Sequence, residues 1–257
     1  MDDATASTSS RSHASLGLTH LALAAAVAAL GAVGWAGWSV IQQSREAAAR
    51  SRCNLGQIRL AMENYQVDHG VLPPACLVGP KGEPLLSWRV LLLPYMDDEQ
   101  KDLYSRFCLN EPWDSEHNIA LLAEMPKSYA VEYERVRKLP PHHTVYRVFT
   151  GPGALFEGGV NSRQDCPDGK DSTLLFVEAG EPVPWSRPDD FHFLSHDSVV
   201  LRGMFPGYCR AMAVEGSYRY LREELPQSTL RALLTRDGGE SLPENWSSYR
   251  PPRPSQQ

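Results

Sequence analysis

Three aspartates stand close together in one short stretch of the chain, at Asp165, Asp168 and Asp171, with Gly169 between them. Carboxylate oxygens in a flexible loop are the ligands that calcium prefers. The spacing is not that of an EF-hand, however, and no glutamate follows where the bidentate ligand would stand. An ordinary solvated turn explains the same residues. The stretch is therefore only a weak calcium candidate, and we expect no other cofactor.

Residue patterns of common enzymes are missing. The chain contains no G-x-S-x-G motif, and the run from Gly169 to Ser172 lacks the upstream glycine of a phosphate loop. His192 and His196 stand four residues apart, but no glutamate lies between them to complete a zinc hydrolase. We therefore expect no catalytic residues and no enzymatic activity. An exported enzyme is the least favoured of the functions considered.

The cysteines set limits on covalent bridging. They number five, which in an exported domain allows at most two disulfides and leaves one thiol. None belongs to a C-x-x-C pair, so a structural zinc site is not indicated. The pairing among them stays open: Cys53, Cys76, Cys108, Cys166 and Cys209.

A long apolar segment near the N-terminus dominates the organisation of the chain. Residues Leu18 to Ile41 contain no Asp, Glu, Lys or Arg. As a helix they would extend about 36 Å, against a hydrocarbon core of about 30 Å. Trp35 and Trp38 stand near the exit, where indoles favour the membrane boundary. The segment is longer than the core of a cleavable signal peptide, and it predicts a single membrane-spanning helix.

The helical pattern continues beyond the apolar segment. Leu55, Ile58 and Met62 recur at spacings of three and four, and charged residues occupy the other faces. Gly70 supplies a C-terminal cap, and the prolines that follow prevent continuation. An amphipathic helix that buries this apolar face against a sheet is therefore predicted.

The remaining sequence predicts a mixed α+β domain. Helices are expected at 87–95, 97–107, 115–125 and 228–234, the third capped by Asp114 and the last ended by Gly238 and Gly239. Strands are expected at 144–150, 173–179, 199–204, 209–214 and 217–221, with a hairpin turn at Glu215-Gly216. Strands joined by such short turns pair antiparallel.

These expectations divide the chain into five parts. They are a disordered segment over 1–16, a transmembrane helix over 17–41, its amphipathic continuation over 42–70, a globular domain over 71–242 and a Pro/Ser-rich tail over 243–257. The net charge of −6 and the absence of a basic run argue against a nucleic-acid partner.

Several blocks of sequence resemble one known family. Reading onward from Gly17, the chain contains REAA and CNL near the end of the apolar helix, then YQVDHGVLPP, SWRVLLLPY, NEPWDSEHN, GPGALFEGG, FVEAGEPVPW and LRALLTRDGG. In order and spacing, they resemble the planctomycete-type pilin-like family with a prepilin N-terminus, domain of unknown function 1559. The resemblance implies a pilin-like fold, with one long helix packed on an antiparallel sheet. It also implies processing after Gly17, before Leu18.

Departures from the family pattern shape the functional expectation. The acidic residue that prepilins carry five positions after the cleaved glycine is Ala22, and a later signature has Phe205 and Glu215 for its histidine and aspartate. Cleavage at Gly17-Leu18 and polymerisation both stay open.

The expected function is structural. The chain would be a single-pass protein of the inner membrane, with a periplasmic domain, that associates with other pilin-like subunits or a type II secretion platform. The arginines that follow the apolar segment favour the opposite orientation, and the resemblance outweighs them. The alternative is a membrane-anchored extracytoplasmic binding module that does not polymerise.

Overall fold

The computed structural model of the 257-residue chain describes residues 31–39, 42, 49–50, 52–131, 139–157, 165–194, 198–205, 207–243 and 245–247. The chain divides into two compact units, Met1–Ala49 and Arg50–Gln257. In the first unit, residues 31–39 are helical and expose Trp35 and Trp38. Among the residues that the structure describes, no helix is both long and apolar enough to cross a membrane. Most of the predicted span, and the whole predicted segment 1–16, lie outside those residues.

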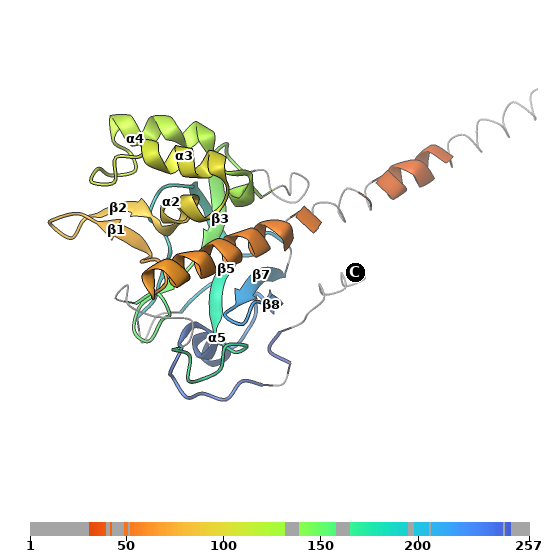
Figure 1. Cartoon of the computed structure of the whole chain (residues 1–257). Helices are drawn as coiled ribbons and strands as arrows, with labels where there is room; N and C mark the ends of the chain where they lie inside the picture. The colour runs from red at the N-terminus through yellow and green to blue at the C-terminus, as the bar shows by residue number, and fades with distance from the viewer. Residues whose placement is uncertain are drawn as a thin grey trace, which may run out of the picture. The chain divides into compact units, whose positions relative to one another are not determined.

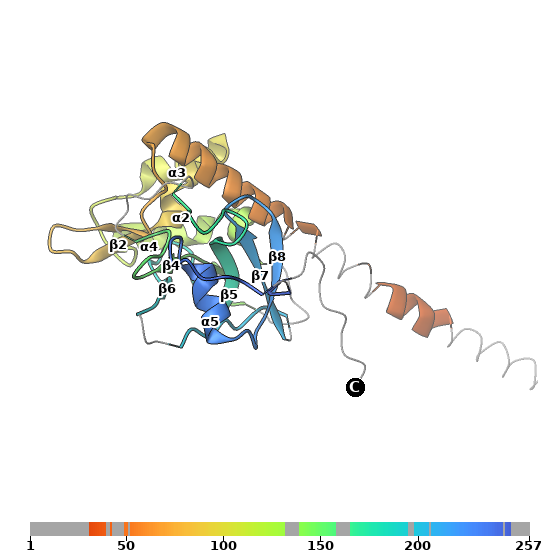
Figure 2. The same cartoon turned by 90° about the horizontal axis from the view of Figure 1, so that it is seen from below.

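The second unit mixes short helices and strands (Figures 1 and 2). After a helix over 52–69, the elements are β1 (Cys76–Val78), β2 (Pro84–Ser87), α2 (Trp88–Leu91), η1 (Leu93–Tyr95), α3 (Asp98–Arg106), α4 (Glu116–Ala120), η2 (Leu121–Glu124), η3 (Lys127–Tyr129), β3 (His143–Arg147), β4 (Phe149–Thr150), β5 (Leu174–Pro184), β6 (Phe191–His192), β7 (Tyr208–Ala213), β8 (Tyr218–Arg222) and α5 (Gln227–Leu234).

The main sheet has four strands in the order β3-β5-β7-β8, and every neighbouring pair is antiparallel. Strands β1 and β2 form a separate antiparallel pair, and β4 and β6 form a short parallel one. The predicted α+β class with an antiparallel sheet and short helices is therefore confirmed.

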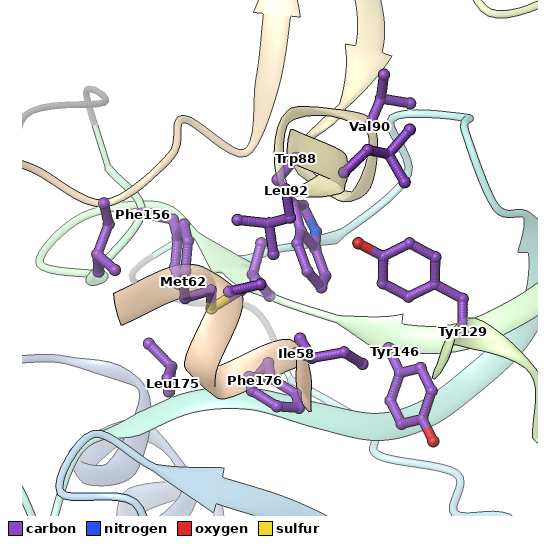
Figure 3. Packing of buried hydrophobic residues seen from close by; sticks show 14 of the residues in the cluster. Ile58, Met62, Trp88, Val90, Leu92, Tyr129, Tyr146, Phe156, Leu175 and Phe176 are labelled. Carbon is purple, nitrogen blue, oxygen red and sulfur yellow. The ribbon is translucent and has the colours of Figure 1, made fainter. Parts of the chain in front are cut away.

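One face of the sheet is covered by the helix over 52–69. Leu55, Ile58 and Met62 have no exposed surface, and they share a core with Leu175 and Phe176 of β5 (Figure 3). The predicted apolar face of this helix is confirmed. The helix ends as expected, since Gly70 has a φ of 76° and donates its N–H to Gln66 O at 2.8 Å.

The opposite face of the sheet carries α5. Leu230, Leu233 and Leu234 pack into a second core with Val177 of β5 and Ala211 of β7. Because inward and outward residues alternate along a strand, β5 and β7 each supply side chains to both cores. This arrangement explains why the two central strands are so thoroughly buried.

Two predicted strands and one helix end differ from expectation. No named strand forms over 199–204: the side chain of Gln227 bonds both the N–H and the C=O of Val199 at 2.9 Å, and Gly203 makes an isolated antiparallel bridge to Ala179 of β5. The predicted strand over 144–150 breaks at Val148, whose N–H donates to Asp190. Helix α5 ends at Leu234, before the predicted glycines, because Thr235 is extended.

Two smaller corrections concern a cap and the tail. Helix α4 is capped by Ser115, whose Oγ accepts from Asn118 N at 3.1 Å, and the predicted cap Asp114 does not serve. Within the predicted tail over 243–257, Trp246 packs against the second core, and the guanidinium of Arg219 lies 5.4 Å from its ring centroid. The structured domain thus extends past residue 242.

A buried arginine clamp as the candidate functional site

One fully buried polar side chain, Arg89, makes hydrogen bonds to four different residues. It lies in α2, a single turn that follows β2 directly, and Ser87 caps this turn by accepting from Arg89 N at 3.3 Å. The side chain of Arg89 has no exposed surface. A buried arginine needs acceptors for its N–H donors. Without them, burial of its charge costs on the order of several kcal/mol.

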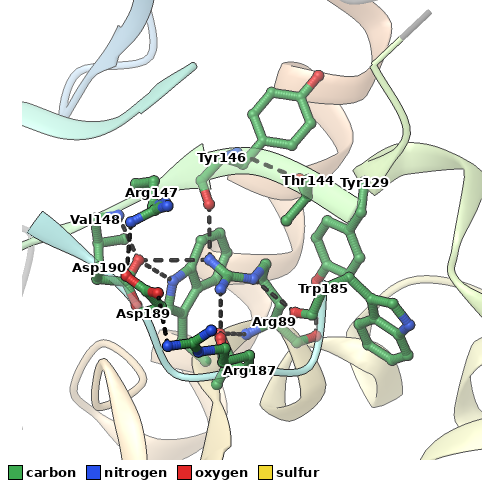
Figure 4. A network of polar contacts seen from close by, with 12 residues as sticks. Arg89, Tyr129, Thr144, Tyr146, Arg147, Val148, Trp185, Arg187, Asp189 and Asp190 are labelled. Atoms are coloured by element: carbon green, nitrogen blue, oxygen red, sulfur yellow. Dashed lines mark hydrogen bonds and ion pairs between the residues drawn. The ribbon is translucent and has the colours of Figure 1, made fainter. Parts of the chain in front are cut away.

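Each nitrogen of the Arg89 guanidinium donates to a main-chain carbonyl from a distant part of the chain (Figure 4). Nε donates to Trp185 O at 2.8 Å, Nη1 to Tyr146 O at 2.7 Å and Nη2 to Arg187 O at 2.8 Å. In addition, the backbone carbonyl of Arg89 accepts from the hydroxyl of Tyr129 at 2.7 Å. Arg89 therefore joins the turn after β2 to β3, to η3 and to the segment after β5.

The negative charge of the cluster comes from Asp190, whose side chain is 5% exposed. Its Oδ1 accepts from Val148 N at 2.9 Å, from Trp88 Nε1 at 3.1 Å and from Arg89 Nη1 at 3.4 Å. Its Oδ2 is buried and has no hydrogen-bond partner among the described residues. Within the described structure, Oδ1 of Asp190 therefore accepts hydrogen bonds from the protein, and Oδ2 accepts none.

Burial is the main influence on both ionic groups. Desolvation raises the pKa of Asp190, and the attraction of Arg89 and the bond from Val148 oppose this only in part. Desolvation likewise lowers the pKa of Arg89, and Asp190 opposes that shift. The direction for Asp190 agrees with its geometry, since a carboxylate with one unpartnered buried oxygen is poorly stabilised in its charged form.

A second layer of charge surrounds this clamp. Arg147 Nη1 donates to Asp189 Oδ1 at 2.9 Å, and Arg187 Nη2 lies 3.4 Å from Asp189 Oδ2. Asp189 and the Arg187 side chain are partly exposed, so these contacts mark the boundary between the clamp and solvent.

The arrangement holds the protein together and offers little to a ligand. All three nitrogens of Arg89 are used within the protein, and neither Arg89 nor Trp88 has exposed surface. The clamp gathers two of the blocks on which the resemblance rests, since Arg89 lies in SWRVLLLPY and Trp185 ends FVEAGEPVPW. Sequence reasoning missed its role. The available signal was one arginine inside an otherwise apolar run, because Arg is almost never fully buried unless paired.

A second buried ion pair joins two strands of the sheet. Arg210 of β7 stands directly opposite Glu178 of β5, and Arg210 Nη2 lies 3.1 Å from Glu178 Oε2. The guanidinium lies 4.9 Å from the ring centroid of Phe205, which stacks on Tyr208. Burial lowers the pKa of Arg210 to about 10 and raises that of Tyr208 to about 12. Phe205, which departs from the family pattern, therefore covers an ion pair.

The aspartates predicted as weak calcium candidates make hydrogen bonds within the protein. Both carboxylate oxygens of Asp168 accept from Gly239 N, at 3.0 and 3.1 Å, so this side chain fastens its loop to the chain after α5. Asp171 accepts from its neighbour Ser172. Among the described residues, no group of three or more His, Cys, Asp or Glu side chains is placed to hold a metal ion.

The other residues singled out from the sequence are scattered. Thr150 Oγ1 lies 3.1 Å from His192 Nδ1 in an exposed pair, and His196 lies outside the described residues. Gly17 and Leu18, the predicted processing site, also lie outside them. All five cysteines are free thiols; Cys166 and Cys209 are buried, and burial raises the pKa of each.

Comparison with known proteins gives one match. The family model SBP_bac_10, described as a protein of unknown function (DUF1559), matches residues 42–205. No curated protein and no solved structure matches the chain. The matched region covers more than half of the chain and includes both Arg89 and Asp190 of the clamp. The chain belongs to the DUF1559 family.

Proposed function

We propose that this protein is a structural, single-pass membrane protein of the pilin or pseudopilin type, with its globular domain outside the inner membrane. The observation that carries the proposal is the helix over 52–69, which lays Leu55, Ile58 and Met62 on an antiparallel sheet. In the sequence this helix follows soon after an apolar run long enough to span a bilayer. A helix that is apolar first and amphipathic afterwards is the organisation of pilin-like subunits.

A structural role also fits the way in which the domain uses its polar groups. The donors of Arg89 go to main-chain carbonyls, and Glu178 and Arg210 form an ion pair between strands. The exposed pair of Thr150 and His192 resembles a nucleophile and base, but no third group is bonded to His192 to orient it within the described structure. These contacts favour an architectural role over catalysis.

Ala22 supports a restricted form of the proposal. A cleaved subunit beginning at Leu18 would present an ammonium group to its neighbour within the membrane, where an unpaired charge is expensive. A carboxylate five positions after the cleaved glycine would offset it, and Ala22 cannot. The protein would then be a minor subunit at a filament tip, within a type II secretion or type IV pilus-like system. The alternative that the same residue favours is an uncleaved, anchored binding module.

Mass spectrometry of the membrane-extracted N-terminus distinguishes these forms. A mature end at Leu18, together with copurification with other pilin-like subunits, is expected for a minor pilin. Ala22→Glu should then raise incorporation into sheared surface filaments, and Ala24→Glu is the matched control, because it adds the same charge at another position. Abundant filaments made of this protein alone would refute the restricted form.

Membrane topology provides an independent test. A reporter that is active only in the periplasm, fused after Gln257, should be active, and the equivalent cytoplasmic reporter should be silent. The opposite pattern would place the domain in the cytoplasm and overturn the proposal. It would also agree with the orientation that the positive-inside rule predicts from the arginines after the apolar segment.

A further inference from the structure

A cluster of polar aromatic side chains lies where the helix over 52–69 ends beside η1. Tyr65 and His69, one turn apart on this helix, stack with their ring centroids 4.2 Å apart. Tyr95 of η1 meets both rings edge-on, at 5.4 Å from the ring centroid of Tyr65 and 6.2 Å from that of His69. Burial raises the pKa of Tyr65, and the hydroxyl of Tyr104 on α3 adds to this shift, so these two hydroxyls lie close together. The three tyrosines all pack against the first core.

The hydroxyl of Tyr95 is the meeting point of this cluster. Its oxygen lies 3.0 Å from His69 Nε2. Burial raises the pKa of Tyr95, and the charge of Asp68 and a hydrogen bond to its carboxylate raise it further, so the carboxylate also lies beside this hydroxyl. An imidazole nitrogen, a carboxylate and a phenol oxygen thus converge. Asp68 and His69 are exposed and Tyr95 is half-buried, so a ligand can reach the three groups from solvent.

The backbone and the packing of the rings fix these groups in place. Asp68 and His69 stand in the last turn of their helix, and Tyr95 ends η1, where its N–H donates to Leu92 O at 3.0 Å. Stacking on Tyr65 orients the imidazole. The three donor groups are therefore brought together before a ligand arrives, which lowers the entropic cost of binding.

The chemistry of the donors selects a metal ion. Calcium and magnesium take oxygen ligands, whereas imidazole suits transition metals. Zinc favours thiolate and imidazole ligands in a tetrahedral site. Iron accepts imidazole and carboxylate together, and a tyrosine oxygen is also an iron ligand in proteins. Neighbouring ligands about 2.1 Å from a metal lie about 3.0 Å apart in an octahedron and about 3.4 Å apart in a tetrahedron. The separation of His69 Nε2 from the Tyr95 oxygen matches the octahedron.

We propose that Asp68, His69 and Tyr95 form a binding site for a ferric ion. The ligands are the Asp68 carboxylate, His69 Nε2 and the Tyr95 oxygen, and water or a small anion takes the remaining coordination positions. Binding releases the Tyr95 proton to solvent, because the phenolate is the ligand, and the charge of the ion offsets the effect of burial on that hydroxyl. The site does not depend on the proposed function, and it would serve a minor pilin and an anchored binding module equally.

Iron binding by the full chain in detergent micelles tests the proposal. The chain, without a polyhistidine tag, is incubated with ferric citrate and desalted, and iron and protein are then measured in the same sample. Iron should be retained in an equimolar amount, with the visible charge-transfer band of a ferric phenolate. This band reports a tyrosine ligand directly, because iron held by carboxylates alone lacks it.

Single substitutions assign the ligands. Tyr95→Phe removes only the hydroxyl, and it should abolish the band and weaken iron binding by about tenfold or more. Asp68→Asn, at an exposed position, should weaken binding by a similar factor. Tyr208→Phe on β7 is the matched control, because it removes the hydroxyl of another half-buried tyrosine, and it should leave both the retained iron and the band unchanged.

Three outcomes would overturn the proposal. The first is a wild-type chain that retains no iron after desalting. The second is iron that the Tyr95→Phe and Tyr208→Phe variants retain alike with the same band, because its ligands would then lie elsewhere. The third is retention of zinc in place of iron when both metals are offered as citrate complexes, because the site would then not be one for ferric ion.

Discussion

The two edge strands of the main sheet, β3 and β8, differ in whether their outward main-chain groups are hydrogen-bonded. At the β3 edge, Tyr146 O accepts from Arg89 and the adjoining Val148 N donates to Asp190. At the β8 edge, the outward groups of Tyr218 and Tyr220 meet no donor or acceptor of the described chain. Side chains of the same molecule thus bond the main chain at the β3 edge. At the β8 edge, no group of the described chain bonds the main chain of Tyr218 and Tyr220 on its outward side.

A side-chain clamp can end a sheet without creating a new edge, and a further strand cannot. A strand added beside β3 would present a new edge and would need covering in turn. Arg89 and Asp190 end the ladder, because they are buried side chains and present no new main-chain edge. The comparison predicts that residues of the closed edge contribute strongly to stability and that residues of the open edge contribute little.

The largest effect is expected for Arg89→Met. The change keeps most of the apolar volume but leaves the carbonyls of Tyr146, Trp185 and Arg187 without donors, and it leaves Asp190 as an unpaired buried charge. Removal of one partner from a buried ion pair costs about 3–5 kcal/mol. Urea unfolding of the detergent-solubilised chain, followed by tryptophan fluorescence, measures the loss. An unfolding free energy within about 1 kcal/mol of the wild type would mean that the clamp is not needed to close this edge.

A pH-dependent effect is expected from Asp190. Burial raises its pKa in the folded chain, so the folded state holds the proton more tightly than the unfolded state does. The stabilisation that this group contributes is therefore complete below its ordinary carboxyl pKa of 3.8 and is lost as the pH rises through the folded-state value. The unfolding free energy of the wild type relative to Asp190→Asn should fall as the pH increases over that interval. A difference that stays constant with pH, or rises, would be inconsistent with a raised pKa for Asp190.

A moderate effect is expected at the cap of α2. Ser87→Ala removes the acceptor for Arg89 N in the turn that presents the guanidinium. Loss of such a cap costs about 1 kcal/mol. Ser105→Ala is a suitable control, because Ser105 is exposed on α3 and its hydroxyl bonds only the carbonyl of Asp102. Thermal unfolding should separate the two variants, and equal melting temperatures would argue that the cap does not hold Arg89 in place.

The smallest effect is expected at the open edge. Arg222→Met in a dilute, monomeric sample should change the unfolding free energy by no more than about 0.5 kcal/mol, as is usual for exposed positions. The pair Arg89→Met and Arg222→Met makes the same chemical change at the two edges. If both variants lost similar stability, the contrast between the edges would be wrong.

Much of this fold follows from local patterns in the sequence. The spacing of Leu55, Ile58 and Met62 predicts which helical face is buried, and Glu215-Gly216 predicts the β7–β8 hairpin, in which Gly216 has a φ of 106°. Such features depend on residues that lie near one another in the chain. The β1–β2 pair was missed because Cys76–Val78 is only three residues long and shows no alternation that could be recognised.

The clamp was not predicted because its members are far apart in sequence. Asp190 and Arg89 are separated by 101 residues, and the aspartate lies two residues after Pro188 in what reads as an ordinary loop. A contact of the same kind occurs in the strand expected over 199–204, where a side chain from α5, Gln227, bonds the main chain of Val199. Hydrogen bonds that side chains make to a distant backbone leave no periodic trace in the sequence.

The hydroxyl of Tyr218 donates to Arg52 O at 2.6 Å, and these residues are 166 positions apart in the chain. At a synthesis rate of about 5–20 residues per second, a nascent helix over 52–69 therefore waits roughly ten to thirty seconds before the strand that covers its start has been made. During that interval Leu55, Ile58 and Met62 have no β7 or β8 to pack against. Contacts of such long range also slow folding once the chain is complete. The apolar face of this helix is thus covered only late, after most of the chain has been made.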